Sequence, residues 1–340
     1  MRFDSNGIES NFSATLFEQP FAPDVVTRGV CLDEDGNVYV SGITGFPTPS
    51  DTRRVIIEKF NFELTTGAEW KDLTTELGIA NDTDGDVIRF PMTVDDDGHL
   101  YFAGTPGVHT AASQLNLYQF SIATKTLLKT WTIDATNVYA NTNVVYLETD
   151  PDGTIIVGFI DRFYRFDPVT ETQTGPYHPR GVSLNGTLVD PGPTLNIAVL
   201  DNGDVLIPTP EGNPVTGVQD SNIWRFSKFF VFKQRYSLPG PIEGTGVNNY
   251  GPSLFIAIRV VVRGLTNSYF WTGDHLGNNS VSNPPDNKVL KVDLSSSTLT
   301  RQGSMTTNFG SEGIFDMAVC LKRAHPTKVR VPQATLIGAN

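Results

Sequence analysis

The stretch GVCLDEDGNVYVSG, residues 29–42, decides the fold: an apolar run, an Asp-rich turn ending in glycine, and a second apolar run. Asp-Gly or Asn-Gly between alternating apolar residues is a strong β-hairpin signal, because the turn needs a positive φ angle. The pattern returns in PMTVDDDGHLYFAG (91–104), VYLETDPDGTIIVGF (145–159) and NIAVLDNGDVLIPT (196–209). We predict four hairpins with turn glycines Gly36, Gly98, Gly153 and Gly203. A degenerate fifth copy spans 254–273, with Gly264 in its turn, and a half copy spans 314–321.

A second series alternates with these hairpins. It consists of a basic or polar residue, an apolar centre, and then Asp, Asn or Ser, as in EKFN, YQFS, YRFD, WRFS and LKVD. The apolar centres are Phe60, Phe120, Phe166, Phe226 and Val292. A turn and a further strand follow each centre, so each unit holds four strands in roughly 45 to 65 residues, the size of a propeller blade.

The N-terminal MRFD is a sixth copy of the second series, centred on Phe3. This copy would be the third strand of a sixth blade. The first two strands of that blade are expected near the C-terminus, from IFDMAVCL (314–321) and KVRVPQATLI (328–337). We therefore predict one all-β domain, a six-bladed β-propeller of four-stranded blades, closed where the N-terminal strands join the C-terminal strands. Because the fifth copy is degenerate, seven blades are an alternative count. A parallel solenoid is the main alternative fold. The predicted blades cover about 28–72, 90–134, 143–176, 194–238, 253–304, and 313–340 with 1–16.

The first hairpin also carries a family resemblance. Residues 29–49 pair an Asp-x-x-Gly-Asn turn with Val-Tyr-Val-x-Gly, which resembles the repeats of NHL-type and SBBP-type β-propeller proteins. The match is good over 29–49, fair over 91–104 and weak elsewhere. The resemblance implies a propeller and no particular activity, because such rings host binding modules and enzymes alike.

Composition limits the function classes. The chain has 340 residues, with 39% hydrophobic and 18% charged, as expected for a globular protein. A net charge of -12 argues against binding to nucleic acid or to an anionic membrane, because phosphates would be repelled. There is no long apolar run and no signal-peptide pattern, so the expected location is cytoplasmic or virion-associated. The two cysteines, Cys31 and Cys320, are expected to be buried thiols on inner strands.

Strand order predicts two unlike faces. The hairpin between first and second strands and the turn between third and fourth strands share one end of the ring, the turn face. Connections from second to third strands, and from blade to blade, share the other end, the long-loop face. The predicted long loops are 43–54, 71–89, 105–114, 177–192, 208–221, 239–251 and 273–287. Function usually sits on loops of a rigid scaffold, so the long-loop face is the predicted binding surface.

Candidate residues on that face are Phe46, His109, Tyr250, Asp274 and His275. The segment NDTDGD offers Asp82, Asp84 and Asp86 at alternating positions, as in part of a Ca²⁺ loop. Position 12 from Asp82 is Thr93 rather than the Glu of an EF-hand, so a solvated turn is the favoured interpretation, and no cofactor is predicted. The Asp residues of the hairpin turns are explained by their turn role. The four tryptophans recur within predicted strands, which favours packing between blades.

No catalytic motif is present: there is no nucleophile elbow, P-loop, paired-histidine zinc motif or dinucleotide fingerprint. The favoured function is a non-catalytic binding or structural module that meets a protein partner, or self-assembles, through the long-loop face. A component of a phage virion, in its head, neck or tail, is one version. The alternatives are a propeller hydrolase or lactonase with a metal in the central channel, and a carbohydrate-binding propeller.

Overall fold

The strands of this protein, seen in a computed structural model, form antiparallel meanders of four. The structure describes the backbone of residues 2–3, 9–11, 26–33, 35–44, 54–61, 67–77, 91–104, 115–133, 146–159, 162–182, 188–189, 197–200, 202–212, 219–237, 257–260, 269–273, 288–293 and 300–306. It places side chains in residues 29–33, 35–42, 54–61, 67–76, 91–104, 115–133, 146–159, 162–181, 197–200, 202–207 and 223–236.

Five four-stranded sheets lie within this part of the chain. The first sheet holds β3 (Val26–Leu32), β4 (Val38–Thr44), β5 (Arg54–Phe60) and β6 (Gly67–Asp72). The second holds β7 (Met92–Val94), β8 (His99–Gly104), β9 (Leu115–Ser121) and β10 (Leu127–Ile133). The third holds β11 (Tyr146–Thr149), β12 (Ile155–Gly158), β13 (Phe163–Asp167) and β14 (Thr172–Tyr177). The fourth holds β17 (Ala198–Val199), β18 (Val205–Gly212), β19 (Gln219–Phe226) and β20 (Phe232–Ser237). The fifth holds β21 (Ala257–Val260), β22 (Tyr269–Gly273), β23 (Lys288–Asp293) and β24 (Thr300–Thr306).

The predicted hairpin turns are present in the first four sheets. Gly36, Gly98, Gly153 and Gly203 have φ angles of 80°, 81°, 85° and 78°. Such angles are costly for residues with a side chain, which explains the glycine at the same place in every turn. The fifth hairpin, β21–β22, pairs as predicted, while Gly264 lies outside the described residues.

The second repeat series forms the third strand of each sheet. Its centres Phe60, Phe120, Phe166 and Phe226 are all at most 3% exposed. Val292 lies on β23. The residues on either side of each centre point to the opposite face of the strand, where the repeat places polar residues.

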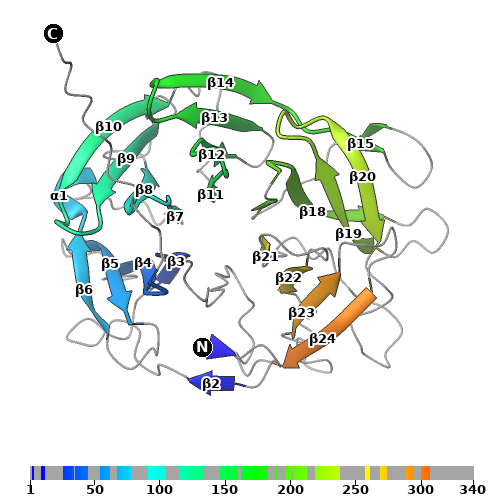
Figure 1. Cartoon of the computed structure of the whole chain (residues 1–340), viewed down its shortest axis with the longest axis horizontal. Helices are drawn as coiled ribbons and strands as arrows, with labels where there is room; N and C mark the ends of the chain where they lie inside the picture. Colours follow the sequence, from blue (N-terminus) through cyan, green and yellow to red (C-terminus); the bar gives the residue numbers. More distant parts are fainter. Residues whose placement is uncertain are drawn as a thin grey trace, which may run out of the picture.

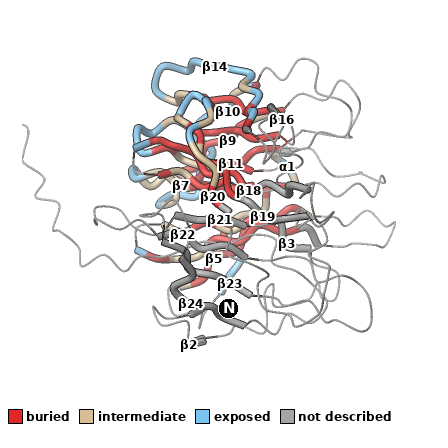
Figure 2. The backbone as a smooth tube through the Cα atoms, turned by 90° about the vertical axis from the view of Figure 1, so that its right-hand side faces the viewer, coloured by how far each residue is buried: buried red, intermediate tan, exposed pale blue. Residues whose placement is uncertain are grey.

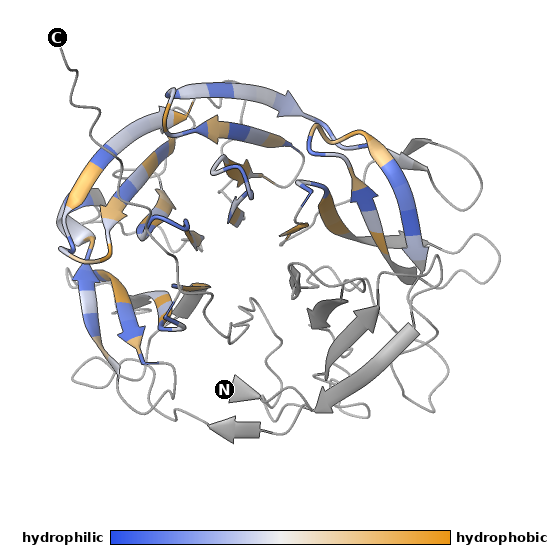
Figure 3. Cartoon of the chain, viewed as in Figure 1, coloured by the Kyte–Doolittle hydropathy of each residue, from blue (hydrophilic) through white to orange (hydrophobic). Residues whose placement is uncertain are grey.

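The sheets are arranged radially, like the blades of a propeller (Figure 1). The first strands lie toward the middle and contact one another in succession, β3 with β7, β7 with β11, β11 with β17 and β17 with β21. The fourth strands run along the perimeter. Figure 2 shows buried residues along the inside of the sheets and exposed residues on the turns and outer strands. Figure 3 shows the same gradient in hydropathy, with β14 mostly hydrophilic.

Aromatic side chains join neighbouring sheets. Trp70 on β6 packs edge-on against Phe120 of the second sheet, with ring centroids 6.3 Å apart. Trp131 on β10 packs against Phe166 of the third sheet at 5.0 Å. These two tryptophans confirm the prediction of packing between blades. Trp224 packs against Phe226 and Phe232 of its own sheet, within a buried cluster that also holds Phe163 of the third sheet.

Three of the predicted long loops contain regular structure, which corrects their extent. The 208–221 segment is largely a strand hairpin, because β18 and β19 pair as far as Gly212 and Gln219. The 177–192 segment holds a small hairpin of β15 (Gly181–Val182) and β16 (Leu188–Val189). The 71–89 segment begins with the end of β6 and α1 (Thr74–Leu77), where Asp72 Oδ1 accepts a hydrogen bond from the Thr74 backbone at 2.9 Å.

The N-terminal repeat forms β1 (Arg2–Phe3), paired with β2 (Glu9–Asn11). Its predicted partners at 314–321 and 328–337, and Cys320, lie outside the described residues. Cys31 is buried on β3, as predicted. Within the described part of the chain, no helix has the length and apolar character to cross a membrane.

Candidate functional site

Polar groups at the turn face recur from sheet to sheet, beginning with the first sheet, whereas Arg54, Asp72 and Thr74 form a separate polar cluster at the long-loop end of that sheet. Asp33 opens the β3–β4 turn, and its carboxylate accepts hydrogen bonds from the Asn37 backbone at 2.8 Å and from the Tyr39 hydroxyl at 3.1 Å. Lys59 Nζ lies 3.8 Å from the same carboxylate. Burial, reinforced by Asp33, raises the pKa of Tyr39, so this tyrosine is a neutral donor at physiological pH.

The second sheet repeats this arrangement. Asp95 accepts hydrogen bonds from the His99 backbone at 2.8 Å and from the Tyr101 hydroxyl at 3.0 Å. The His99 ring nitrogen lies 2.9 Å from Asp95. Gln119 donates to the Tyr101 hydroxyl at 2.9 Å. Burial, followed by Asp95, raises the pKa of Tyr101 as well.

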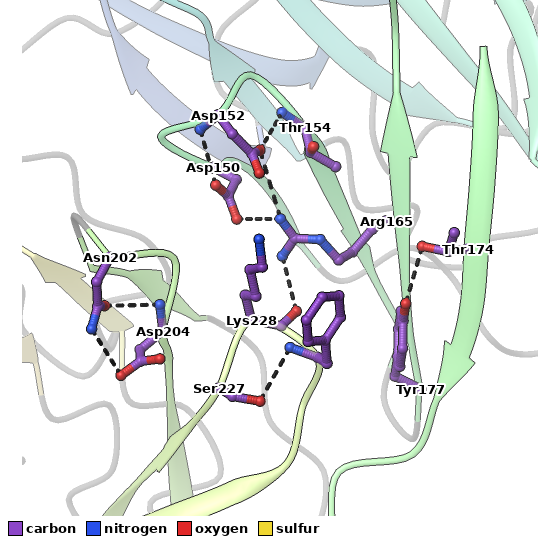
Figure 4. Close-up of polar contacts among 11 residues, drawn as sticks. Asp150, Asp152, Thr154, Arg165, Thr174, Tyr177, Asn202, Asp204, Ser227 and Lys228 are labelled. Carbon is purple, nitrogen blue, oxygen red and sulfur yellow. Dashed lines mark hydrogen bonds and ion pairs between the residues drawn. The ribbon is translucent and has the colours of Figure 1, made fainter. Parts of the chain in front are cut away.

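The third sheet contains the most buried ion pair of this set, Asp150 with Arg165 (Figure 4). Their side chains are 2% and 7% exposed. The other guanidinium nitrogen donates to the Lys228 carbonyl oxygen of the fourth sheet at 3.2 Å. Burial raises the pKa of Asp150 by more than the Arg165 hydrogen bond lowers it, which shows how strongly this site is desolvated.

In the fourth sheet, the acidic residue lies at the end of the hairpin turn rather than at its start. Leu200 stands where the other turns begin with Asp, and Asp204 stands four residues later. Asp204 accepts from Arg225 Nε at 2.7 Å, from Lys233 Nζ at 2.6 Å and from Asn202 Nδ2 at 3.1 Å. Burial alone would raise the pKa of Asp204, but the hydrogen bonds from Lys233 and Arg225 outweigh it and lower that pKa.

One repeat position on the third strand contacts the polar groups of the hairpin turn in all four sheets. It is the residue directly before the apolar centre: Lys59, Gln119, Arg165 and Arg225. In three sheets this residue reaches the turn carboxylate, and in the second it reaches the tyrosine bound to that carboxylate. The sequence contained the signal, because a basic or polar residue precedes every centre. Its partner could not be read from spacing, since the pair spans two strands.

A notch of about 610 Å³ opens on the turn face between the first and second sheets. Acidic side chains dominate its charged lining, with Asp33, Asp35, Glu69 and Asp97 against Lys59 and Lys125. Glu69 pairs with Arg54 at 2.8 Å, while Asp35 and Asp97 have no ion pair with any described residue. Ile122, Ala123 and Ala68 supply apolar wall. This notch has room for another molecule.

The chemistry of these carboxylates is structural. The turn acids bind backbone amides, tyrosine hydroxyls and cations of the same sheet, which leaves few oxygens for a metal. Within the side chains that the structure describes, no group of three or more His, Cys, Asp and Glu could hold a metal ion. Asp82, Asp84 and Asp86, the residues of the Ca²⁺ prediction, lie outside the described residues.

The residues predicted for the long-loop face also lie outside the described residues. They are Phe46, His109, Tyr250, Asp274 and His275. The strands that precede these residues show where their loops begin. Phe46 follows β4, His109 follows β8, and Asp274 and His275 follow β22. All three connections leave from the ends of second strands, so they start from the same end of the ring.

No family model and no curated protein sequence matches this chain. Solved structures resemble it in overall shape. A chain of the mitotic checkpoint complex has 10% identity and a TM-score of 0.44, covering 94% of this chain and 92% of that one. The Hadza microbial sialidase Hz136 has 11% identity and a TM-score of 0.49, and this chain, aligned over 83% of its residues, spans 58% of that protein. The N11 neuraminidase-like protein of A/flat-faced bat/Peru/033/2010 (H18N11) has 13% identity and a TM-score of 0.40, covering 86% and 90%. At these identities and TM-scores, none of the three bears on what this chain does.

Proposed function

We propose that the protein is a six-bladed propeller that acts as a non-catalytic binding or structural module. It presents its long-loop face to a protein partner within a larger assembly, for which a phage virion is one candidate. No metal or other cofactor takes part in this function, and nucleic acid and membranes are not its partners.

The blade count rests on the N-terminal repeat. Arg2 and Phe3 match the residues before and at the centre of the third strands, and β1 pairs antiparallel with β2 as a third strand pairs with a fourth. This hairpin lies between the first and fifth sheets in Figure 1. Two strands from the C-terminal residues would complete a sixth sheet and leave no open sheet edge at the seam.

The observation that carries the proposal is the unlike chemistry of the two ends of the ring. At the turn face, a turn acid is bound by the residue before the strand centre in three sheets, and in the second sheet Gln119 binds the tyrosine attached to that acid, so these polar groups maintain the scaffold. At the long-loop face, the connections differ from sheet to sheet, from the extended β18–β19 hairpin to the β15–β16 hairpin and α1. Varied connections on a rigid ring are typical of a surface that recognises a partner.

Site-specific photo-crosslinking tests this proposal. Benzoylphenylalanine replaces Phe46 or Tyr250 on the long-loop face, and as matched control Val169, which is 88% exposed on the turn face. In extract from the source, we expect one discrete protein, other than a second copy of this chain, crosslinked at positions 46 and 250, and no such protein at 169. Such a protein crosslinked at 169 alone, or at none of the three positions, would overturn the proposal.

Native mass spectrometry with and without EDTA separates the proposal from the hydrolase alternative. We expect the same mass in both conditions. A metal ion lost to EDTA, together with lactone hydrolysis that needs that metal, would assign the protein to the enzymes. Retention on a glycan array that is abolished by Phe46→Ala or Tyr250→Ala would assign it to carbohydrate binding.

A further inference from the structure

The turn between β19 and β20 exposes two large apolar side chains. Phe229 is 57% exposed and Val231 is 65% exposed, on either side of the buried Phe230. Phe230 has a φ angle of 59°, in the left-handed region that bulky residues avoid. Its ring stacks on Phe163 at 4.4 Å and on Tyr177 at 5.4 Å, both in the third sheet. The inserted ring fixes the turn, so Phe229 and Val231 are held outward.

Hydrogen bonds within the turn add to this rigidity. Ser227 Oγ accepts from the backbone of Phe229 and of Val231, each at 3.2 Å. Lys228 Nζ lies 5.2 Å from the centre of the Phe229 ring. The turn therefore presents an aromatic ring beside a cation in a preformed geometry, which lowers the entropy cost of binding.

The β19–β20 turn packs at the junction of the third and fourth sheets. The notch occupies the equivalent position at the junction of the first and second sheets. Ser121, Ile122 and Ala123 of the second sheet correspond to Ser227, Lys228 and Phe229 of the fourth. At the junction of the third and fourth sheets, the larger residues fill the space. Arg165 binds the Lys228 carbonyl (Figure 4), and Lys228 Cβ lies 3.3 Å from where a Cβ on Gly203 would stand. At the junction of the first and second sheets, Ile122 and Ala123 are smaller, and the notch stays open.

Charge also favours a basic turn in the notch. Its charged lining carries an excess of two carboxylates, and Asp35 and Asp97 have no ion pair with a described residue. Lys228 is exposed beside Phe229. Entry of Phe229 would bring the Lys228 ammonium to these carboxylates, where partial burial strengthens the attraction.

We propose that the β19–β20 turn of one copy inserts Phe229 into the notch of a second copy, which forms a two-fold dimer through the turn faces. The notch lies between the first and second sheets, which are on the left in Figure 1, whereas β19 and β20 are on the right. A two-fold axis in the plane of that view exchanges the two sides, so both contacts form at once. A self-complementary pair of contacts is the requirement for a closed dimer.

This dimer leaves the long-loop face of both copies free and is independent of the function proposed above. Because Phe229 is 57% exposed, its insertion buries about 90 to 140 Å². The surrounding turns must supply the remainder of the roughly 800 Å² per partner of a stable interface.

Sedimentation velocity on the full chain tests the proposal, with three kinds of variant. Phe229→Ser removes the anchor, Lys228→Glu reverses the charge of the turn, and Asp97→Lys reverses the charge of the notch. Leu128→Ser is the matched control, because Leu128 is 46% exposed on the outer strand β10 and does not line the notch. We expect wild type and the control to dimerise alike. Phe229→Ser should weaken the dimer about a thousandfold, since two anchors of roughly thirtyfold each are lost.

Mixing the two charge variants gives the sharpest result. Lys228→Glu and Asp97→Lys should each be monomeric alone, because like charges meet in both contacts. An equimolar mixture should form a heterodimer, in which one contact is wild type and the other has its charges exchanged. This arm does not depend on the folding of Phe229→Ser. A monomeric wild type at about 100 µM, well above the Kd range of specific interfaces, a dimer that survives Phe229→Ser, or a mixture that stays monomeric would overturn the proposal.

Discussion

Replacing Arg165 with leucine removes the cation from the most buried ion pair of the turn face. Arg165 is 7% exposed at its side chain, and it binds both the Asp150 carboxylate and the Lys228 carbonyl. Leucine fills most of the space of the arginine stem but leaves Asp150 with one hydrogen bond, from the Asp152 backbone at 3.1 Å. The variant therefore isolates a buried charge without opening a large cavity.

The expected loss of unfolding free energy is about 3 to 5 kcal/mol, the usual cost of breaking a buried pair on one side. With a urea slope of about 3 kcal/mol per molar, the midpoint should fall by roughly 1 to 1.7 M. The loss should depend on pH. Burial already raises the pKa of Asp150, and without Arg165 that pKa rises further. The folded variant then binds a proton more tightly than the unfolded chain, so its deficit should be smaller at pH 5 than at pH 8.

Urea unfolding followed by tryptophan fluorescence at both pH values provides the measurement. Lys129→Ala is the matched control, because Lys129 and Glu171 form an ion pair in which both side chains are 50% exposed; it should leave the midpoint unchanged. An Arg165→Leu midpoint equal to that of wild type, or a deficit that grows toward pH 5, would refute the reasoning about a desolvated carboxylate.

Three further predictions concern single positions. Gly98→Ala should cost about 1 to 2 kcal/mol in urea unfolding, from backbone conformation alone, because no atom lies within 4 Å of the added Cβ; Gly98→Asn should cost less, and equal costs would contradict this cause. Asp204→Asn should lose about 2 kcal/mol at pH 7, and since the pKa of Asp204 is lowered on folding, the gap between variant and wild type should narrow progressively as pH falls below about 4; a gap at pH 3 as large as that at pH 7 would contradict the ion-pair explanation. Phe230→Ala should lose about 3 to 5 kcal/mol in thermal unfolding of dilute protein, while its exposed neighbour Phe229→Ala should lose less than about 0.5; similar losses would contradict the insertion of Phe230.

The repeating elements could be predicted from the sequence because their causes are local. A turn that needs positive φ selects glycine, and a strand between two packed layers selects an apolar centre such as Phe120. Both requirements recur in each blade, so weak signals add up over the chain. The four-strand order of each sheet, the turn glycines and the packing role of Trp70 and Trp131 follow from this kind of evidence.

Contacts between strands and between sheets could not be predicted in the same way. The shift of the turn acid from position 200 to Asp204 looks like a lost repeat in sequence, and only the pairing with Arg225 shows that its role is kept. Phe230 reads as part of an apolar strand, whereas it fills a space in the neighbouring sheet. The 208–221 segment, with its prolines and glycine, has the composition of a loop although most of it pairs as strand.

Amide hydrogen exchange read out by mass spectrometry tests the central claim, a ring of six sheets closed by the two ends of the chain. Peptides covering residues 1–12 and 328–337 are compared with peptides from β23 and β24. The account predicts that both end segments exchange slowly, at rates close to those of β23 and β24, and that deletion of residues 1–12 releases the protection of 328–337. Exchange of either segment at the rate of an unfolded chain, or protection of 328–337 that survives the deletion, would contradict it.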